Sequence, residues 1–264
     1  MSGSRGQDGG SALYAVERQQ SLLATLRATG RVEVARAAEE LHVTTETIRK
    51  DLSELEHQGL LRRVRGGAVA GEGLSFEPAV PARTEYTDEK KRIARRALRE
   101  LPRQGTVLID AGSTTTYFAE MIPGDRDLTV FTNTLTIALA LVSRPRLTVY
   151  TTGGRVRERT FAEVEGWALR ALREINVDVA FLGCNGVDVD AGLTTPDPVE
   201  ADIKREMFGI ARRRVLLTDH SKIGHASLRR YGSVGDIDLM ITDTGIADAD
   251  ADRLTAAGVE LVRA

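Results

Sequence analysis

A run of polar residues, Asp110-Ala111-Gly112-Ser113-Thr114-Thr115, follows an apolar stretch of the chain and opens a helical one. Backbone N–H groups at a helix N-terminus bind anions, and the hydroxyls after Gly112 add donors, so this turn predicts a phosphate site. Lys222 can supply a compact positive charge to the same phosphate. Asp110, Asn133 and Asp219 are better suited to the hydroxyls of a sugar.

Four further polar segments follow apolar runs in the same way: Thr132-Asn133, Thr152-Gly153-Gly154, Gly183-Cys184-Asn185-Gly186 and Thr218-Asp219-His220-Ser221-Lys222. The short apolar runs predict six buried strands, at 106–109, 128–131, 147–150, 179–182, 214–217 and 239–241. Helical stretches separate most of them, which is typical of a parallel sheet covered on both faces. Ligands bind at the edge where parallel strands end, so we expect all five segments to line one crevice. Each segment alone is a common kind of turn.

A second group of residues, nearer the start of the chain, is suited to contact DNA. Helices are predicted at 14–28 and 34–42, and a third begins after Thr44, a hydroxyl N-cap, and ends before Gly59. The third helix places Ile48, Leu52 and Leu55 on one face. Its other face carries, near the start, Thr45, Glu46, Thr47, Arg49 and Lys50. In a recognition helix such side chains contact base edges and phosphates.

Three arginines, Arg62, Arg63 and Arg65, precede the glycine pair Gly66-Gly67, where we expect a small hairpin, or wing. This arrangement suits contact with phosphates or with the minor groove. Acidic residues offset the cations of the third helix: Glu46, Asp51, Glu54 and Glu56. We therefore expect modest binding per monomer and a need for two half-sites. The alternative is a three-helix domain for protein contact with an ordinary solvated face, and periodicity alone favours neither.

Length and composition fit two domains. The 264 residues contain 36 Lys and Arg and 38 Asp and Glu, so bulk charge gives no argument for nucleic acid. We expect an α/β protein with a disordered terminus at 1–11, a winged helix-turn-helix domain at 12–70, a linker at 71–87 and an effector-sensing domain at 88–264. The lone cysteine, the absence of an apolar run of about 20 residues and the lack of a signal peptide predict a cytoplasmic protein.

The residues after Thr44 resemble the DeoR family of bacterial repressors. That family's pattern reads Ser-x-x-Thr-Ile-Arg-Arg-Asp-Leu, then Leu-Glu-x-x-Gly, then Arg-x-His-Gly-Gly-Ala. The corresponding segments here are Thr44-Thr45-Glu46-Thr47-Ile48-Arg49-Lys50-Asp51-Leu52, Leu55-Glu56-His57-Gln58-Gly59 and Arg63-Val64-Arg65-Gly66-Gly67-Ala68. Thr44, Lys50 and Arg65 depart from the pattern, which puts the operator sequence in doubt rather than the activity.

The resemblance extends over residues 76–245. The segments that carry it are Asp110-Ala111-Gly112-Ser113-Thr114, Thr132-Asn133, Gly153-Gly154, Gly183 with Gly186, Glu200-Ala201 with Lys204, and Asp219-His220-Ser221-Lys222. The family's sensor domain is similar in fold to ribose-5-phosphate isomerase and glucosamine-6-phosphate deaminase, and commonly answers to phosphorylated sugars. The resemblance therefore implies a repressor of carbohydrate-metabolism genes, a homodimer or homotetramer on double-stranded operator DNA, released by a sugar phosphate. Neither a metal nor another cofactor is expected.

An enzyme is the strongest rival. A sugar-phosphate isomerase or deaminase would also place carboxylates and a lysine at strand ends, and Asp110, Asp219, Glu200 and Lys222 are capable of acid–base work. Such an enzyme does not need the N-terminal domain. Cys184 is expected to be a small residue of the pocket wall, not a nucleophile, and Trp167 is expected to fill core space. The run Lys90-Lys91-Arg92 is expected on the solvated face of a helix at 88–101.

Overall fold

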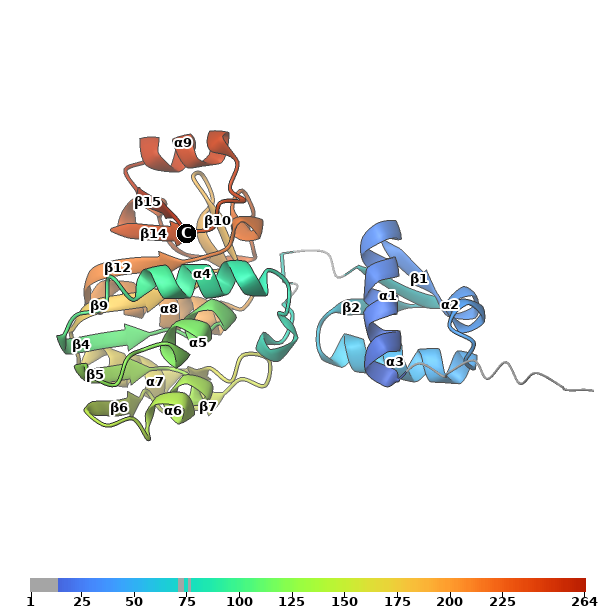
Figure 1. Cartoon of the computed structure of the whole chain (residues 1–264), viewed down its shortest axis with the longest axis horizontal. Coiled ribbons are helices and arrows are strands. Elements are labelled where there is room, and N and C mark those ends of the chain that lie inside the picture. Colours follow the sequence, from blue (N-terminus) through green and yellow to red (C-terminus); the bar gives the residue numbers. More distant parts are fainter. Residues whose placement is uncertain (1–13, 71–73, 76) are drawn as a thin grey trace, which may run out of the picture. The chain divides into compact units, whose positions relative to one another are not determined.

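The computed structural model describes residues 14–70, 74–75 and 77–264, and the chain divides into two compact units between residues 72 and 73 (Figure 1). The predicted disordered stretch at 1–11 lies outside the described residues. Among the helices of the described residues, none has the length and apolar character needed to cross a membrane.

The N-terminal unit is a winged helix-turn-helix. Its elements are α1 (Ala15–Thr29), β1 (Arg31–Glu33), α2 (Val34–Glu40), α3 (Thr45–His57), β2 (Leu61–Val64) and β3 (Gly67–Ala70). The apolar faces of the helices meet in one core, where Leu22, Ile48, Leu52 and Leu55 are fully buried. The predicted helices and hairpin are confirmed.

Strand β1 is an element that the sequence did not predict. Its three residues are too few to show an alternating pattern, and it forms only by pairing antiparallel with β3, from Arg31 opposite Val69 to Glu33 opposite Gly67. A Cβ on Gly67 would lie 1.9 Å from the carbonyl oxygen of Val32. Glycine is therefore required at this position by the close approach of the two backbones.

The second unit contains one parallel sheet of seven strands in the order β15-β14-β12-β9-β4-β5-β6. The strands are β4 (Gln104–Ile109), β5 (Asp127–Thr132), β6 (Leu147–Thr151), β9 (Val177–Leu182), β12 (Ala211–Leu217), β14 (Leu239–Thr242) and β15 (Glu260–Arg263). All six predicted strands are present. The strand predicted at 147–150 is not buried as expected, because β6 lies at the edge of the sheet, where Thr148 and Tyr150 are exposed. Strand β15 was missed, since exposed charged residues occupy both of its ends.

Helices cover both faces of this sheet (Figure 1). On one face lie α4 (Thr87–Ala97), α5 (Ser113–Glu120) and α6 (Leu135–Leu141), which share a core with Phe118 and Ile137. The other core includes α7 (Gly166–Arg173), α8 (Pro198–Ile210) and α9 (Asp248–Ala256). The chain winds outward from β4 to β5 and β6, and then outward from β9 on the other side. The carboxyl ends of β4 and β9 thus form the switch point where such sheets bind ligands.

Smaller elements join these layers. They are two short sheets, β7 (Arg155–Val156) with β8 (Glu163–Val164), and β10 (Gly186–Asp188) with β11 (Gly192–Thr195) and β13 (Arg229–Gly232), and three single helical turns, η1 (Val80–Ala82), η2 (His220–Lys222) and η3 (Val234–Asp236). The stretch expected as a linker is partly integral to this unit: Glu77 is buried, and the Val80 N–H donates to the carbonyl of Arg159.

Two expectations about single side chains were wrong. Trp167 is 71% exposed instead of filling core space, because it stands on the outer flank of α7 while Ala168 and Leu172 turn inward. Lys90 is buried instead of solvated, and its Nζ donates to the backbone carbonyls of Arg83 and Glu85. Burial lowers the pKa of Lys90, and the nearby positive charge of Lys222 acts in the same direction.

Candidate functional site

Helix α3 presents the polar face expected of a recognition helix. The Thr44 hydroxyl caps the helix by accepting from the backbone N–H of Thr47 at 3.1 Å. Thr45, Glu46, Arg49 and Lys50 are exposed, and Thr47 is partly exposed. The Arg49 guanidinium donates to Glu46 at 3.2 Å, so an internal ion pair already holds it in the absence of DNA. The DNA contacts of these residues stay predictions.

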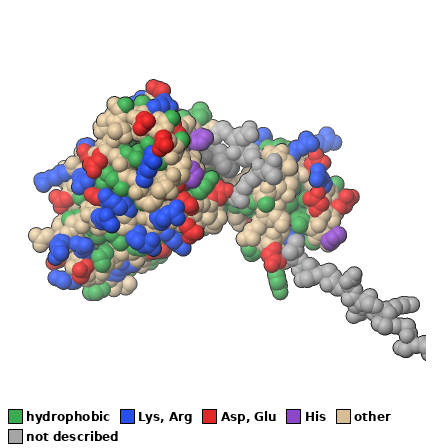
Figure 2. All heavy atoms as spheres, turned by 45° about the horizontal axis from the view of Figure 1, so that its top comes forward, with side chains coloured by type: hydrophobic (Ala, Val, Ile, Leu, Met, Phe, Trp, Pro, Cys, Tyr) green, Lys and Arg blue, Asp and Glu red, His purple; other side chains and the backbone are tan. Residues whose placement is uncertain are grey.

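One of the acids expected to offset these cations has a different partner. Asp51 is buried and accepts two hydrogen bonds from Arg18 of α1, at 2.8 and 3.2 Å. A buried bidentate pair of this kind fixes the orientation of two elements. Asp51 therefore locks α3 against α1. Figure 2 shows both acidic and basic side chains on the surface of this unit.

The wing exposes the three predicted arginines. Arg62 and Arg63 lie on β2, and Arg65 lies in the turn before Gly66. Arg63 is tied back to α3: its backbone N–H donates to Glu56 at 2.7 Å, and its guanidinium donates to the hydroxyl of Ser53 at 2.7 Å. These bonds fix the wing beside the recognition helix.

In the second unit, hydrogen bonds join the carboxyl ends of β4, β5 and β9. The Asn133 side chain accepts from the backbone N–H of Ala111 at 2.9 Å, and Asp110 Oδ2 accepts from the N–H of Gly183 at 3.1 Å. Further along, the Cys184 thiol donates to the hydroxyl of Thr218 at 3.3 Å, which adds the end of β12. Segments scattered from residue 110 to residue 218 therefore meet at one edge of the sheet.

Asp110 lies at the centre of this edge with one oxygen unsatisfied. It is 1% exposed, and its Oδ2 also forms an ion pair with Lys204 of α8. The Lys204 Nζ donates in addition to the carbonyl of Gly183 at 3.1 Å. Burial raises the pKa of Asp110, while Lys204 and the Gly183 N–H oppose that rise by stabilising the carboxylate. Among the described residues, Asp110 Oδ1 has no hydrogen-bond partner, so it is a buried acceptor whose hydrogen-bonding capacity is unused.

The predicted phosphate turn begins α5 at Ser113. The hydroxyls of Thr115 and Thr116 both donate to the carbonyl of Gly112, at 3.0 and 2.7 Å, so they stabilise the turn itself. Ser113 is partly exposed, whereas Thr114 and Thr115 are buried. The anion donors that this turn can offer are therefore chiefly the backbone N–H groups at the start of α5.

At the end of β6, a buried carboxylate uses donors that we expected to face the ligand. Glu163 accepts from the Thr152 hydroxyl at 3.1 Å and from the Gly153 N–H at 2.6 Å. Gly154 is required by packing, since a Cβ there would lie 2.4 Å from the carbonyl oxygen of Val164. The sequence reasoning missed Glu163, because nothing in its local pattern marks a buried acid.

At the end of β12, Asp219 accepts from the backbone N–H of Ser221 at 3.1 Å and from its hydroxyl, which holds the turn containing Lys222. His220 Nδ1 lies 2.7 Å from Asp243 Oδ2. Burial acts to raise the pKa of Asp243, but hydrogen bonds from the N–H groups of His220 and Gly245 and the nearby imidazole bring it below its usual value. Near β10, Asn185 Oδ1 accepts from the Thr195 hydroxyl at 3.2 Å.

Cys184 is unsuited to nucleophilic catalysis. Desolvation raises the pKa of its thiol to about 11, so the thiolate is scarce at neutral pH. Its hydrogen bond to Thr218 opposes this shift only in part.

Two family profiles together match most of the chain. The DeoR-like helix-turn-helix domain matches residues 18–72, and the DeoR C terminal sensor domain matches residues 85–244. The chain belongs to the DeoR family. The resemblance carried by residues after Thr44 and at the strand ends is thereby confirmed, as is the fold of a helix-turn-helix domain followed by a mainly parallel α/β domain.

Transcriptional regulators match this DeoR-family chain over most of its length and of theirs. The HTH-type transcriptional regulator GlpR of Haloferax volcanii is 37% identical, over 93% of this chain and 96% of that protein. The glycerol-3-phosphate regulon repressor of Escherichia coli K12 is 30% identical, over 86% and 90%. Among solved structures, ribose 5-phosphate isomerase A of Methanocaldococcus jannaschii matches 52% of this chain and 54% of that one, at 17% identity and a TM-score of 0.38.

A buried cluster of charges in the DeoR sensor unit centres on Arg157, after β7. Its guanidinium contacts three carboxylates: Glu200 at 2.5 Å, Glu77 at 2.9 Å and Asp197 at 2.9 Å. Burial acts to lower the pKa of Arg157, but the carboxylates of Glu200 and Glu77 raise it above its usual value, so it stays charged. Arg83 also pairs with Glu77, at 3.0 Å. Sequence reasoning found Glu200 and missed Arg157 and Glu77.

Helix α8 connects this cluster to the sheet edge. Glu200 and Lys204 are four residues apart and lie on the same side of the helix. Glu200 pairs with Arg157, and Lys204 pairs with Asp110. A buried polar chain thus runs from Asp110 at the centre of the edge to Glu77, in the segment that enters from the DNA-binding unit.

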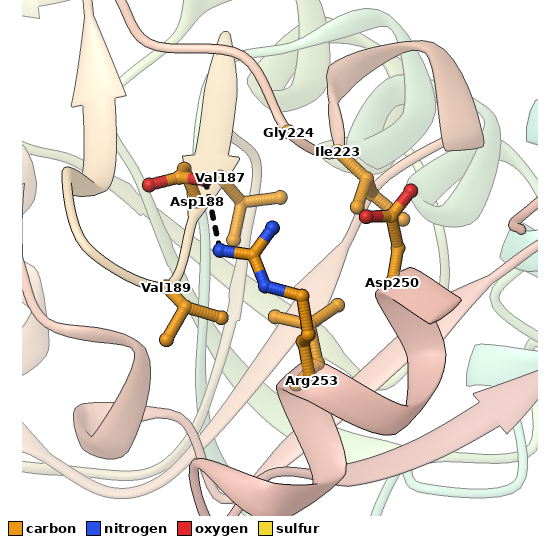
Figure 3. A pocket seen from close by; sticks show the side chains of 8 residues that line it. Val187, Asp188, Val189, Ile223, Gly224, Asp250 and Arg253 are labelled. Atoms are coloured by element: carbon orange, nitrogen blue, oxygen red, sulfur yellow. Dashed lines mark ion pairs between the residues drawn. The ribbon is translucent and has the colours of Figure 1, made fainter. Parts of the chain in front are cut away.

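A separate shallow hollow lies between β10 and α9 (Figure 3). Arg253 stands in it, 3.9 Å from Asp188 and 3.5 Å from Asp190. None of the predicted effector residues lines this hollow, so it is not the predicted site.

Proposed function

We propose that this DeoR-family regulator represses genes of carbohydrate metabolism and that a phosphorylated sugar releases it from its operator. The single observation that carries the effector assignment is Asp110 Oδ1, a buried acceptor without a described partner, at the switch point of the sheet and beside the start of α5. The names of the relatives, among them the glycerol-3-phosphate regulon repressor and a putative aga operon transcriptional repressor, support the regulon class.

In the proposed complex, a sugar hydroxyl donates to Asp110 Oδ1 and the phosphate lies at the N–H groups that begin α5, with Lys222 as the added cation. The hydroxyl thus shares the carboxylate with Lys204, which holds the other oxygen, Oδ2. A displacement of the Lys204 side chain shifts Glu200 through helix α8. Because Arg157 pairs with both Glu200 and Glu77, this displacement reaches Glu77 and the segment that follows the DNA-binding unit. A hundredfold loss of operator affinity requires a coupling free energy of about 2.7 kcal/mol between the two sites.

A thermal-shift screen of the full chain against phosphorylated sugars tests the effector site. We expect one of these compounds to raise the melting temperature of the parent, and Lys222→Ala to abolish that rise while it leaves operator binding intact. Arg212→Ala, at an exposed position on β12, is the matched control and should keep the rise. A normal ligand-induced rise in Lys222→Ala would contradict the phosphate assignment.

The rival enzyme function makes a different prediction. Asp110, Glu200 and Lys204 are engaged in buried ion pairs, and an acid–base catalyst needs a group able to exchange protons with its substrate. Incubation of the purified protein with the stabilising sugar phosphate should therefore yield no isomerised or deaminated product. Catalytic turnover that Asp110→Asn abolishes would favour the enzyme.

A further inference from the structure

The outer strand of the large sheet has an unprotected edge. Strand β6 is the last strand on its side and, within the part of the chain that the structure describes, pairs only with β5 (Figure 1). Its sequence, Leu-Thr-Val-Tyr-Thr, contains no charge. Charged residues commonly protect such edges, and the opposite edge strand, β15, has both Glu260 and Arg263. Strand β6 therefore offers a free row of backbone donors and acceptors.

Exposed apolar side chains flank β6 on the α6 side. Leu135, Leu139 and Val142 are 40%, 74% and 62% exposed. Their spacing of four and three residues aligns them in one stripe, while Ile137 and Leu141 turn into the core. All seven residues of α6 are uncharged. A solvent-facing stripe of this kind is typical of a surface that another protein covers.

Aromatic side chains flank β6 on the other face of the sheet. Tyr150 is 51% exposed and stacks on Phe131, with ring centroids 5.2 Å apart. Helix α7 buries Ala168 on its inner side, and on one flank its Arg173 pairs with Glu206 of α8. Trp167 therefore lies on the opposite flank of α7, away from α8. The start of α7 lies beside the segment after β6, since a Cβ on Gly154 would be 3.4 Å from the Ala168 Cβ.

We propose that this surface, made of β6 with Leu139, Val142, Tyr150 and Trp167 and called the β6 edge surface below, binds the same surface of a second copy of the chain. Two copies related by a two-fold axis bring their β6 strands together antiparallel, which pairs the free backbone groups of both. The proposal goes beyond the proposed function, and its test needs neither DNA nor effector.

Charge and size favour a second copy as the occupant. An uncharged surface meets its own copy without like-charge repulsion, and at its rim Arg155 and Glu165, 2.7 Å apart, have opposite signs that can also pair across the axis. Aromatic side chains bury about 150–250 Å² each, so Tyr150, Trp167 and the α6 stripe supply much of the area of a standard interface, about 800 Å² per partner. A second copy also supplies the second DNA-binding domain that a palindromic operator needs.

Sedimentation velocity of the full chain tests the proposal. We expect the parent to sediment as a dimer or a larger even-numbered assembly, and Leu139→Glu combined with Trp167→Glu to halve that mass or to weaken self-association at least tenfold. Both side chains are more than two-thirds exposed, so the fold should tolerate the changes. Leu228→Glu, at an exposed leucine outside the β6 edge surface, is the matched control. A monomeric parent, an unchanged mass in the double variant, or an equal loss in the control would overturn the proposal.

Cysteine cross-linking locates the contact. Cys184 is the only cysteine of the chain and its thiol has a raised pKa, so background oxidation is low. Thr148→Cys or Tyr150→Cys should give a covalent dimer on mild oxidation, because antiparallel pairing brings at least one β6 position near its own copy. Glu260→Cys, on the opposite edge strand, should run as a monomer in non-reducing, denaturing gel electrophoresis. Failure of both β6 variants to cross-link, or cross-linking of Glu260→Cys alone, would overturn the proposal.

Discussion

At the scale of single residues, Asp110 shows how burial limits what a polar side chain can do. Its Oδ2 is held by Lys204 and the Gly183 N–H, and only Oδ1 is left for a ligand. The sequence predicted Asp110 as a contact for sugar hydroxyls from its place after a strand. The partner Lys204 lies 94 residues away. No local pattern shows that pairing, and the resemblance to the family alone placed Lys204 in the site.

Arg49 is the residue whose loss should separate DNA binding from folding. Arg49→Ala removes an exposed cation of α3, so we expect operator binding to weaken by about 1–3 kcal/mol, roughly 5- to 150-fold, with an unchanged melting temperature. Fluorescence anisotropy with labelled operator measures this loss. Arg212→Ala, at a more exposed arginine of the sensor unit, should bind operator as the parent does. Parent-like affinity in Arg49→Ala would exclude this side chain from the DNA contact.

The lowered pKa of Asp243 predicts a specific dependence of stability on pH. A carboxyl group whose pKa is lower in the folded state stabilises the fold above its unfolded pKa of about 3.9, and this contribution is lost as pH falls through the lower, folded value. In Asp243→Asn the free energy of unfolding should be smaller at pH 7 and should fall less steeply below pH 4. Urea unfolding at a series of pH values measures both effects.

The matched control for that series is Asp252→Asn, at an exposed position of α9. It should reproduce the parent at every pH. If Asp243→Asn and the parent lose stability with the same slope below pH 4, the hydrogen bonds from His220 and Gly245 do not act on the Asp243 carboxylate as described.

At the scale of elements, the sequence predicted what depends on local pattern and missed what depends on distant contacts. The six apolar runs identified six strands correctly, and the helix-turn-helix followed from its periodicity and caps. Strand β1 and the packed segment around Glu77 were missed, because β1 needs β3 for pairing and Glu77 needs Arg157, 80 residues away. Trp167 was misplaced because its residue type, rather than its position on α7, guided the prediction.

Helix α8 and Arg157 form the element that we expect to couple the two functions. Arg157→Lys keeps the positive charge but removes the planar guanidinium group that contacts Glu77, Asp197 and Glu200. We expect the variant to bind the effector, with the ligand-induced rise in melting temperature retained, while the effector's weakening of operator binding falls at least tenfold. Thermal shift and anisotropy on the same preparation measure the two quantities.

Arg155→Lys, two residues earlier and at an exposed ion pair, is the control and should respond to effector as the parent does. An Arg157→Lys protein that is released from operator as fully as the parent would show that coupling does not pass through this cluster. Loss of effector binding in Arg157→Lys would instead place the arginine in the site itself.

At the scale of the whole molecule, one segment of the chain joins the two units. Helix α3 and the wing belong to the first unit, and the loops after β4, β5, β9 and β12 meet at one edge in the second. In the proposed function, communication between them is a difference in effector affinity between the DNA-bound and the released states. Without such a difference, tight effector binding would not change operator occupancy.

Operator affinity measured with and without a saturating phosphorylated sugar tests this claim most directly. We expect the sugar phosphate that stabilises the parent to weaken its operator binding by about a hundredfold, near 2.7 kcal/mol of coupling, and Lys222→Ala to show no weakening. Operator affinity that no phosphorylated sugar alters, or an undiminished response in Lys222→Ala, would contradict it.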